Sequence, residues 1–131
     1  MLNIAIEAAQ TAGKFLKQNL GKVKDIQRKG GEEKNLVTEI DKGSERIIID
    51  IIRRHYPTHD ILAEESGSKE GRSSDYKWII DPLDGTTNFT HGFPVFCVSI
   101  GVEHKGEIIC LRNFPAVWAA SMAMLSIGVV V

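Results

Sequence analysis

Apolar residues recur every three or four positions over residues 2–20, which is the spacing of one face of an α-helix. Gly21 follows directly and is a natural helix stop. These residues therefore predict an amphipathic helix over residues 2–20. The positions that make up its apolar face are Leu2, Ile6, Ala9, Ala12, Leu16 and Leu20.

A second helical pattern begins near Thr38. Thr38 is a plausible N-cap with Asp41 three residues later, which is close to a capping box with Asp in place of Glu. The helix must end before Pro57, because proline disfavours helical backbone at and before its own position. The charged segment between the two helices carries Gly30-Gly31 and predicts a hairpin or a mobile loop. The apolar face of the second helix comprises Ile40, Ile47, Ile48, Ile51 and Ile52.

Strand-like segments occupy the rest of the chain. The stretch DILAEES predicts a short strand that runs into Glu64 and Glu65, and residues 66–76 read as a loop rich in Gly, Ser and charge. YKWII, from residue 76, predicts the next strand, which leads into an aspartate-rich turn.

Residues 95–104 alternate between apolar and small or polar side chains, which indicates a strand with one buried face. A turn at 104–106 leads into a further strand, EIICL. Two helices followed by consecutive strands predict an α/β (α+β) layered sandwich, in which a helix pair packs on a largely antiparallel sheet. The apolar face of the alternating strand comprises Phe96, Val98, Ile100 and Val102.

Composition narrows the class of protein. The chain has 131 residues, of which 43% are hydrophobic and 25% charged, as in an ordinary globular domain. The formal net charge of −1 gives no indication of nucleic acid or an anionic membrane as a partner. Cys97 and Cys110 form no metal-ligand spacing or disulfide framework, which fits a reducing, cytoplasmic environment. The first residues lack the plan of a signal peptide.

The end of the chain is less ordinary, because residues 113–131 contain no charged side chain. Their length is near the roughly 18-residue threshold for a membrane-spanning helix. Pro115, Gly128 and two serines oppose that interpretation, and no basic cluster flanks the segment. A buried or misfit tail is favoured over a membrane span.

Carboxylates gather around the ends of two predicted strands. Glu64 and Glu65 end one strand, and Asp81 and Asp84 flank a Pro-Leu pair at the end of another. Side by side, these strands would bring three or four carboxylates to one sheet edge, where they would repel one another unless paired or protonated. Mg²⁺ prefers oxygen ligands and would remove that repulsion. The sequence therefore predicts a magnesium site that includes the Leu83 carbonyl.

The residues after this turn have the properties of an anion cradle. Gly85 entering a helix or tight turn leaves backbone N–H groups free for phosphate, and the Thr86 hydroxyl is suited to orienting a water. A metal beside such a cradle predicts metal-assisted phosphate hydrolysis. The alternative is purely structural, because Asp-Pro and Asp-Gly are common turn dipeptides and Asp often caps helices.

The strings AEES, WIIDPLDGTTNF and FPVFCVSIGVEHKGEI resemble the N-terminal half of the inositol monophosphatase family. The resemblance runs from about residue 3 to residue 109. It implies a Mg²⁺-dependent, lithium-sensitive phosphomonoesterase acting on a small phosphate ester. It also implies a possible homodimer, since intact members are commonly dimers.

The resemblance implies metal-binding roles for individual residues. Glu64 resembles a ligand of the first metal, and Asp81 resembles a bridge between two metals. The Leu83 carbonyl would complete the first site, and Asp84 resembles a ligand of the second. Glu65 resembles a supporting carboxylate at an outer metal site.

The resemblance also implies catalytic roles. Thr86 and Asp41 resemble the pair that activates the attacking water, and Glu64 is grouped with them. The backbone amides of Gly85 and Thr86 resemble the phosphate cradle. The loop around Lys29-Gly30 resembles the mobile active-site loop of the family.

Two departures from the family pattern leave alternatives open. The second half of the family domain, which supplies another metal ligand and most substrate contacts, does not follow here. The match also fails near Cys110, so we divide the chain into residues 1–111 and an apolar tail, 112–131, and interpret the chain as a truncated or frame-shifted product. The expected function is phosphatase activity on inositol monophosphate or a related sugar phosphate. A non-catalytic remnant that binds metal or a partner protein, and a membrane-tethered protein, are the alternatives.

Overall fold

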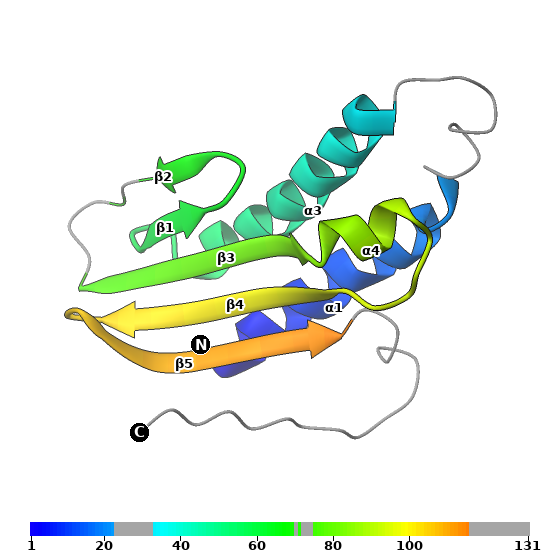
Figure 1. The fold of residues 1–131 in the computed structure, drawn as a ribbon. Coiled ribbons are helices and arrows are strands. Elements are labelled where there is room, and N and C mark those ends of the chain that lie inside the picture. The colour runs from blue at the N-terminus through cyan, green and yellow to red at the C-terminus, as the bar shows by residue number, and fades with distance from the viewer. Residues whose placement is uncertain (23–32, 70, 72–74, 116–131) are drawn as a thin grey trace.

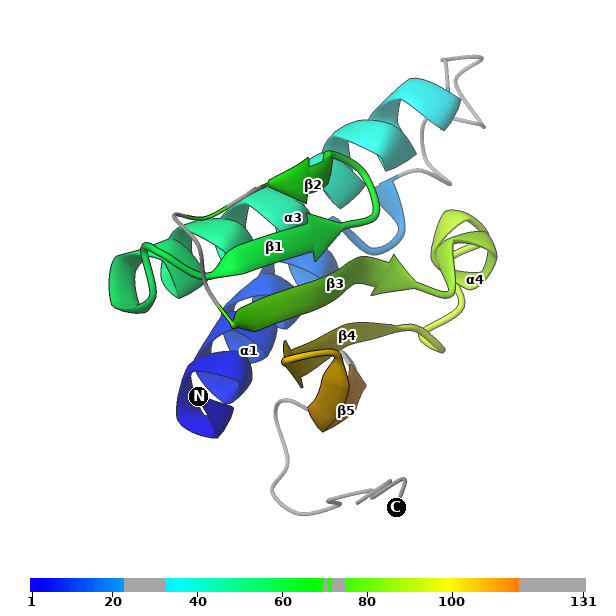
Figure 2. The same cartoon turned by 90° about the vertical axis from the view of Figure 1, so that its left-hand side faces the viewer.

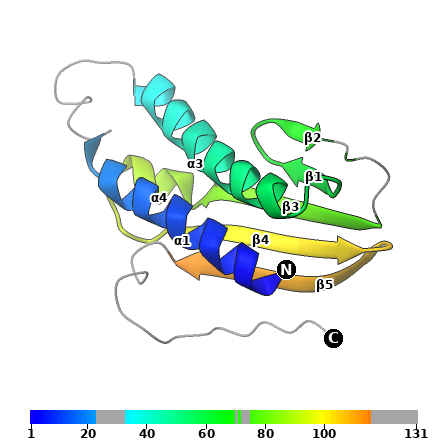
Figure 3. The same cartoon turned by 180° about the vertical axis from the view of Figure 1, so that it is seen from behind.

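Two long helices lie against one face of a five-stranded sheet in the computed structural model (Figures 1 and 2). The structure describes residues 1–22, 33–69, 71 and 75–115. Helix α1 spans Leu2–Asn19 and helix α3 spans Glu33–His55. Seen from behind in Figure 3, α1 lies over β4 and β5, whereas α3 lies nearer β3.

The sheet has the order β2-β1-β3-β4-β5. Its strands are β1 (Asp60–Ala63), β2 (Gly67–Lys69), β3 (Tyr76–Asp84), β4 (Cys97–His104) and β5 (Glu107–Pro115). The pairing of β1 with β3 is parallel, and the other pairings are antiparallel. The expected helix pair on a largely antiparallel sheet is therefore confirmed.

The core lies between the helices and the sheet. Small residues of α1 face inward, which lets the helix approach the sheet and α3 closely. The alternation predicted for residues 95–104 is confirmed, because Val98, Ile100 and Val102 of β4 are buried, whereas the side chains of Cys97, Ser99 and Glu103 are only partly buried. The predicted helix over 2–20 is likewise confirmed, although Leu2 at its start is 40% exposed. The largest fully buried side chains include Leu16, Ile48, Ile52, Trp78, Phe89 and Ile100.

The predicted start of the second helix is wrong. Helix α3 begins at Glu33, so Thr38 lies inside the helix and not at its N-terminus. The segment before Thr38 contains good helix formers, and Val37 is already buried in the core. Packing of this earlier turn therefore overrides the local capping signal.

Two strand predictions also need correction. The loop expected over residues 66–76 contains strand β2, which pairs with β1 as a short hairpin. Strand β3 does not end at Ile80 but continues to Asp84. It passes Pro82 through an irregularity, since Asp81 pairs with Ser99 and the next pair is Asp84 with Cys97. A bulge accommodates a proline in a strand because proline has no N–H to donate.

Several expectations fall outside the described residues. These are the loop around Lys29-Gly30 and the greater part of the tail, residues 116–131. The boundary placed at residue 111 stays a prediction, and β5 runs across it to Pro115. Among the described residues, no helix has the length and apolar character needed to cross a membrane.

The contrast between two isoleucines tests this core. Ile100 in β4 is 0% exposed, whereas Ile109 in the adjacent strand β5 is 51% exposed. We expect Ile100→Ala to lower the free energy of unfolding by about 2–5 kcal/mol, because it leaves a cavity, and Ile109→Ala to lower it by less than about 1 kcal/mol. Urea unfolding of both variants measures the difference. Equal losses would contradict the described packing.

Candidate metal and phosphate site

The carboxyl ends of β1 and β3 meet at one edge of the sheet. The two strands are parallel and paired, with Ala63 opposite Ile80. The chain beyond β1 stays attached to β3, because the Glu64 N–H donates to the Ile80 carbonyl over 3.2 Å. Glu64 and Asp81, which follow these paired positions, are therefore brought together as the sequence predicted.

These two carboxyl groups interact strongly, and the pKa of each is raised. The charge of Asp81 is the main cause that raises the pKa of Glu64, and burial is the main cause that raises the pKa of Asp81. Glu65 and Asp84 raise the pKa of Glu64 further. The cluster is thus a concentrated negative charge that a proton partly neutralises.

Asp41 adds a buried carboxylate to this edge from helix α3. Its side chain is 7% exposed, and Oδ1 has no hydrogen-bond partner within the described part of the chain. Burial is the largest cause that raises its pKa from 3.8 to about 7. Such an oxygen is stable only if it is protonated or lies beside a cation. The neighbouring carboxylates that raise the pKa further are Glu65, Glu64, Asp81 and Glu45.

The turn after Asp81 is held by its own hydrogen bonds. Asp81 Oδ1 accepts from the Leu83 N–H over 3.1 Å, and the Leu83 carbonyl accepts from Thr86 Oγ1 over 3.0 Å. A carbonyl has two lone pairs, so the Leu83 oxygen can accept this bond and still face a metal. Asp84 is exposed, and its Oδ2 accepts a weak hydrogen bond from the Cys97 thiol at 3.5 Å.

Gly85 is the N-cap of the short helix α4, Thr86–Thr90. Its φ of +96° is a conformation that side chains disfavour. A Cβ added there would lie 3.0 Å from the Val95 carbonyl oxygen. Glycine is therefore required here, because it allows Val95 and Phe96 to pack against this turn.

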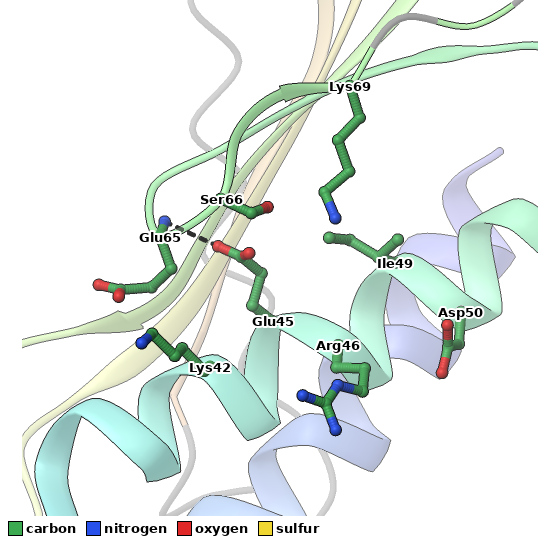
Figure 4. A pocket seen from close by; sticks show the side chains of 8 residues that line it. All are labelled: Lys42, Glu45, Arg46, Ile49, Asp50, Glu65, Ser66 and Lys69. Carbon is green, nitrogen blue, oxygen red and sulfur yellow. Dashed lines mark hydrogen bonds between the residues drawn. The ribbon is translucent and has the colours of Figure 1, made fainter. Parts of the chain in front are cut away.

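Two residues that the sequence analysis missed hold this arrangement from α3. Ser44 Oγ donates to the Pro82 carbonyl over 2.9 Å, and Glu45 Oε2 accepts the Glu65 N–H over 2.8 Å (Figure 4). Both follow Asp41 at the three- and four-residue spacing of one helix face. That spacing was the available signal, but polar residues in a helix normally indicate a solvent-exposed face.

A cavity of about 260 Å³ opens between α3 and the turn after β1 (Figure 4). Its walls do not include Asp41, Glu64 or Asp81, so it adjoins the carboxylate cluster without containing it. Its charged walls come from α3 and from the β1–β2 hairpin. They include Lys42, Glu45, Arg46, Glu65 and Lys69.

The donor set fits a hard divalent cation in kind, because it consists of carboxylate and carbonyl oxygens. The partnerless oxygen of Asp41 supports the same fit. Over the described ranges, no three histidine, cysteine, aspartate or glutamate side chains stand close enough to hold an ion alone. Mg²⁺ usually keeps several waters and needs only one or two carboxylates, so this spacing does not exclude it.

Comparison with known proteins identifies relatives over most of the described chain. A model of the inositol monophosphatase family matches residues 1–110. The Nus factor SuhB of Pasteurella multocida is 51% identical over 107 residues, which are 82% of this chain and 40% of that protein. A fructose-1,6-bisphosphatase/inositol-1-monophosphatase of Aquifex aeolicus is 48% identical over 108 residues, or 81% of this chain and 39% of that protein.

Solved structures agree with this relationship. The inositol monophosphatase from Anabaena has a TM-score of 0.72 and 43% identity, over 88% of this chain and 40% of that one. The corresponding values for the Thermotoga maritima enzyme are 0.71 and 36%, over 88% of this chain and 44% of that one. The chain spans about 40% of the length of the curated relatives it matches.

The raised pKa of Asp41 predicts a pH-dependent stability in the absence of metal. The unfolded chain releases this proton near pH 3.8, whereas the folded chain holds it to about pH 7. The free energy of unfolding should therefore fall as the pH rises from about 4 to 7, because the folded state binds more protons over that range. We expect a loss on the order of 2 kcal/mol, which Asp41→Asn should largely abolish.

Urea unfolding between pH 4 and 8 with a metal chelator measures this loss. Asp50→Asn, at an exposed position on the same helix, is the matched control. If the free energy of unfolding falls equally with pH in the wild type and in Asp41→Asn, the Asp41 carboxyl group is not the cause of the loss.

Proposed function

Because the chain belongs to the inositol monophosphatase family, we propose that it carries the metal- and phosphate-binding part of a Mg²⁺-dependent phosphomonoesterase. The observation that carries this proposal is the partnerless oxygen of Asp41, together with the carboxyl groups of Glu64 and Asp81 at the paired ends of β1 and β3. A cation would neutralise all three groups. The relatives named as inositol monophosphatases support inositol monophosphate or a related sugar phosphate as the substrate class.

The metal-holding residues in this proposal are Glu64, Asp81, the Leu83 carbonyl and Asp84, with Glu65 in support. When bound, Mg²⁺ supplies charge neutralisation at the phosphoryl oxygens and lowers the pKa of a coordinated water. The position of Glu64 and Asp81 at paired strand ends keeps their oxygens near one another without a flexible loop. The Asp81–Leu83 hydrogen bond restricts the turn between Asp81 and Asp84.

The protein's own groups would handle the water and the phosphate. Asp41 accepts the proton of the attacking water, a role suited to a carboxyl group whose pKa lies near 7. The Thr86 hydroxyl donates to the Leu83 carbonyl, so its oxygen is oriented to accept a hydrogen bond from that water. The backbone amides of Gly85 and Thr86 would face the phosphate in this proposal.

Partners and location follow from the same proposal. The primary partner is a small phosphate ester, and the near-neutral charge does not favour nucleic acid. We propose a homodimer in the cytoplasm. The exposed apolar side chains of Phe93 and Val95, which lie close together in the chain before β4, support a protein interface there.

A second candidate function is binding without catalysis. It is favoured by the names of several relatives, which are called Nus factors. In this alternative, the chain binds metal or a partner protein and turns over no substrate.

Phosphate release by the purified 131-residue chain separates the two candidates. We expect release from inositol 1-phosphate or fructose 1,6-bisphosphate to require Mg²⁺, to be inhibited by Li⁺, and to fall roughly 100-fold or more in Asp81→Asn. Release that survives both chelation and Asp81→Asn would sink the catalytic proposal. Mg²⁺ binding without any release would instead favour the non-catalytic candidate.

A further inference from the structure

Helix α3 buries a short polar stripe beside the carboxylate cluster. Asp41 is 7% exposed, Ser44 0% and Glu45 4%, and they are the buried polar or charged residues of the described chain. Their spacing places them on one face of the helix. Below them the same face continues with the core residues Ile48 and Ile52. Burying polar groups is unfavourable unless they form hydrogen bonds, so these three buried side chains are expected to have specific partners.

Glu45 bonds to the turn that follows β1. Its Oε2 accepts the Glu65 N–H over 2.8 Å, a bond strengthened by the charge of the carboxylate. The preceding amide, that of Glu64, donates to the Ile80 carbonyl of β3 over 3.2 Å. Two consecutive amides of this turn are therefore fixed to two different elements, the first to the sheet and the second to helix α3.

Ser44 bonds to the other carboxylate-bearing segment. Its Oγ donates over 2.9 Å to the carbonyl of Pro82, which directly follows Asp81. Pro82 and Leu83 have no partner positions on β4, because the register shifts between Asp81 and Asp84. The Ser44 hydroxyl thus supplies a partner to a buried carbonyl where the strand ladder is interrupted.

We propose that Ser44 and Glu45 are positioning residues that fix the Glu64–Glu65 turn and the Asp81 strand end against helix α3, at the separation that metal binding requires. The inference rests on the proposed function, since it concerns the metal site proposed above. Neither side chain contacts the metal in this inference. They act through the backbone of the ligand-bearing segments, as groups behind metal ligands commonly do.

A purely electrostatic role for Glu45 makes a different prediction. Its carboxylate also contributes to the raised pKa of Asp41, so its charge alone affects the cluster. Glu45→Gln removes the charge but keeps an oxygen that can accept the Glu65 N–H. Glu45→Ala removes both. The two variants therefore separate the hydrogen bond from the charge.

The experiment combines hydrogen exchange without metal and Mg²⁺ titration calorimetry on the full chain. In Glu45→Ala we expect faster exchange of the Glu65 amide and a Mg²⁺ affinity weaker by on the order of tenfold. Glu45→Gln should stay within about threefold of the wild-type affinity and keep the Glu65 amide protected. Ser44→Ala should also weaken Mg²⁺ binding, with faster exchange at Leu83, whose amide donates to Asp81.

Ile52→Val is the matched control, because it lowers stability from the same helix face without touching either bond. It should leave the Mg²⁺ affinity unchanged. If Glu45→Ala does not fold, Ser44→Ala and Glu45→Gln still test the inference through the Leu83 and Glu65 amides.

Three outcomes would overturn the inference. The first is an unchanged hydrogen-exchange rate of the Glu65 amide in Glu45→Ala. The others are equal Mg²⁺ affinities for Glu45→Gln and Glu45→Ala, or a loss of Mg²⁺ affinity in Ile52→Val as large as that in Glu45→Ala. A wild-type chain that binds no Mg²⁺ would overturn the proposed metal function. The exchange data are collected without metal, so they decide separately whether Ser44 and Glu45 fix the two segments.

Discussion

The burial of negative charge at one sheet edge is the constraint on which this site depends. Asp41 places a carboxylate oxygen where it is buried from solvent and has no hydrogen-bond partner among the described residues, and the surrounding carboxylates oppose its ionisation. A fold keeps such a group only if the folding energy of the surrounding packing exceeds the electrostatic cost. Here that packing is extensive, because the same helix α3 that carries Asp41 also buries Ile48 and Ile52 against the sheet.

The one parallel pairing described in the sheet has a specific consequence for this charge. Because β1 and β3 run in the same direction, both strands deliver their carboxyl ends to the same edge. An antiparallel pairing would have separated Glu64 from Asp81 by the length of the strand. The irregularity leaves Pro82 and Leu83 without partners on β4, the ladder resumes at Asp84, and Gly85 then begins helix α4 as its N-cap.

The sequence predicted those features that depend on local pattern. The helix over 2–20 and the alternating strand around Ile100 follow from periodicity, and the grouping of Glu64 with Asp81 follows from their positions at strand ends. The start of α3 could not be predicted in the same way, because burial of Val37 outweighs the capping signal at Thr38. The roles assigned to the site residues stay predictions.

The residues that escaped prediction share a physical reason. Ser44 and Glu45 bond to backbone groups 38 and 20 positions away in the chain, and no local pattern encodes such partners. Polar side chains on a helix are ordinarily solvated, so their burial becomes evident only when the strand ends are in place. Strand β2 was missed for a related reason, since its three residues form a strand by pairing with β1 rather than by their own propensity.

The raised pKa values of Glu64, Asp81 and Asp41 favour protonation of these groups, which lets the metal-free chain tolerate the cluster. Protons and a divalent cation neutralise the same oxygens, so they compete for the site. At low pH the protons suffice, and as the pH rises past about 7 the folded chain gives up the Asp41 proton and the need for a cation increases. Ser44 and Glu45 matter in both conditions, because hydrogen bonds to the backbone hold the two carboxylate-bearing segments whether their charge is neutralised by protons or by metal. Because these two hydrogen bonds are made to backbone groups, they leave the carboxyl oxygens of Glu64 and Asp81 available to a proton or a cation.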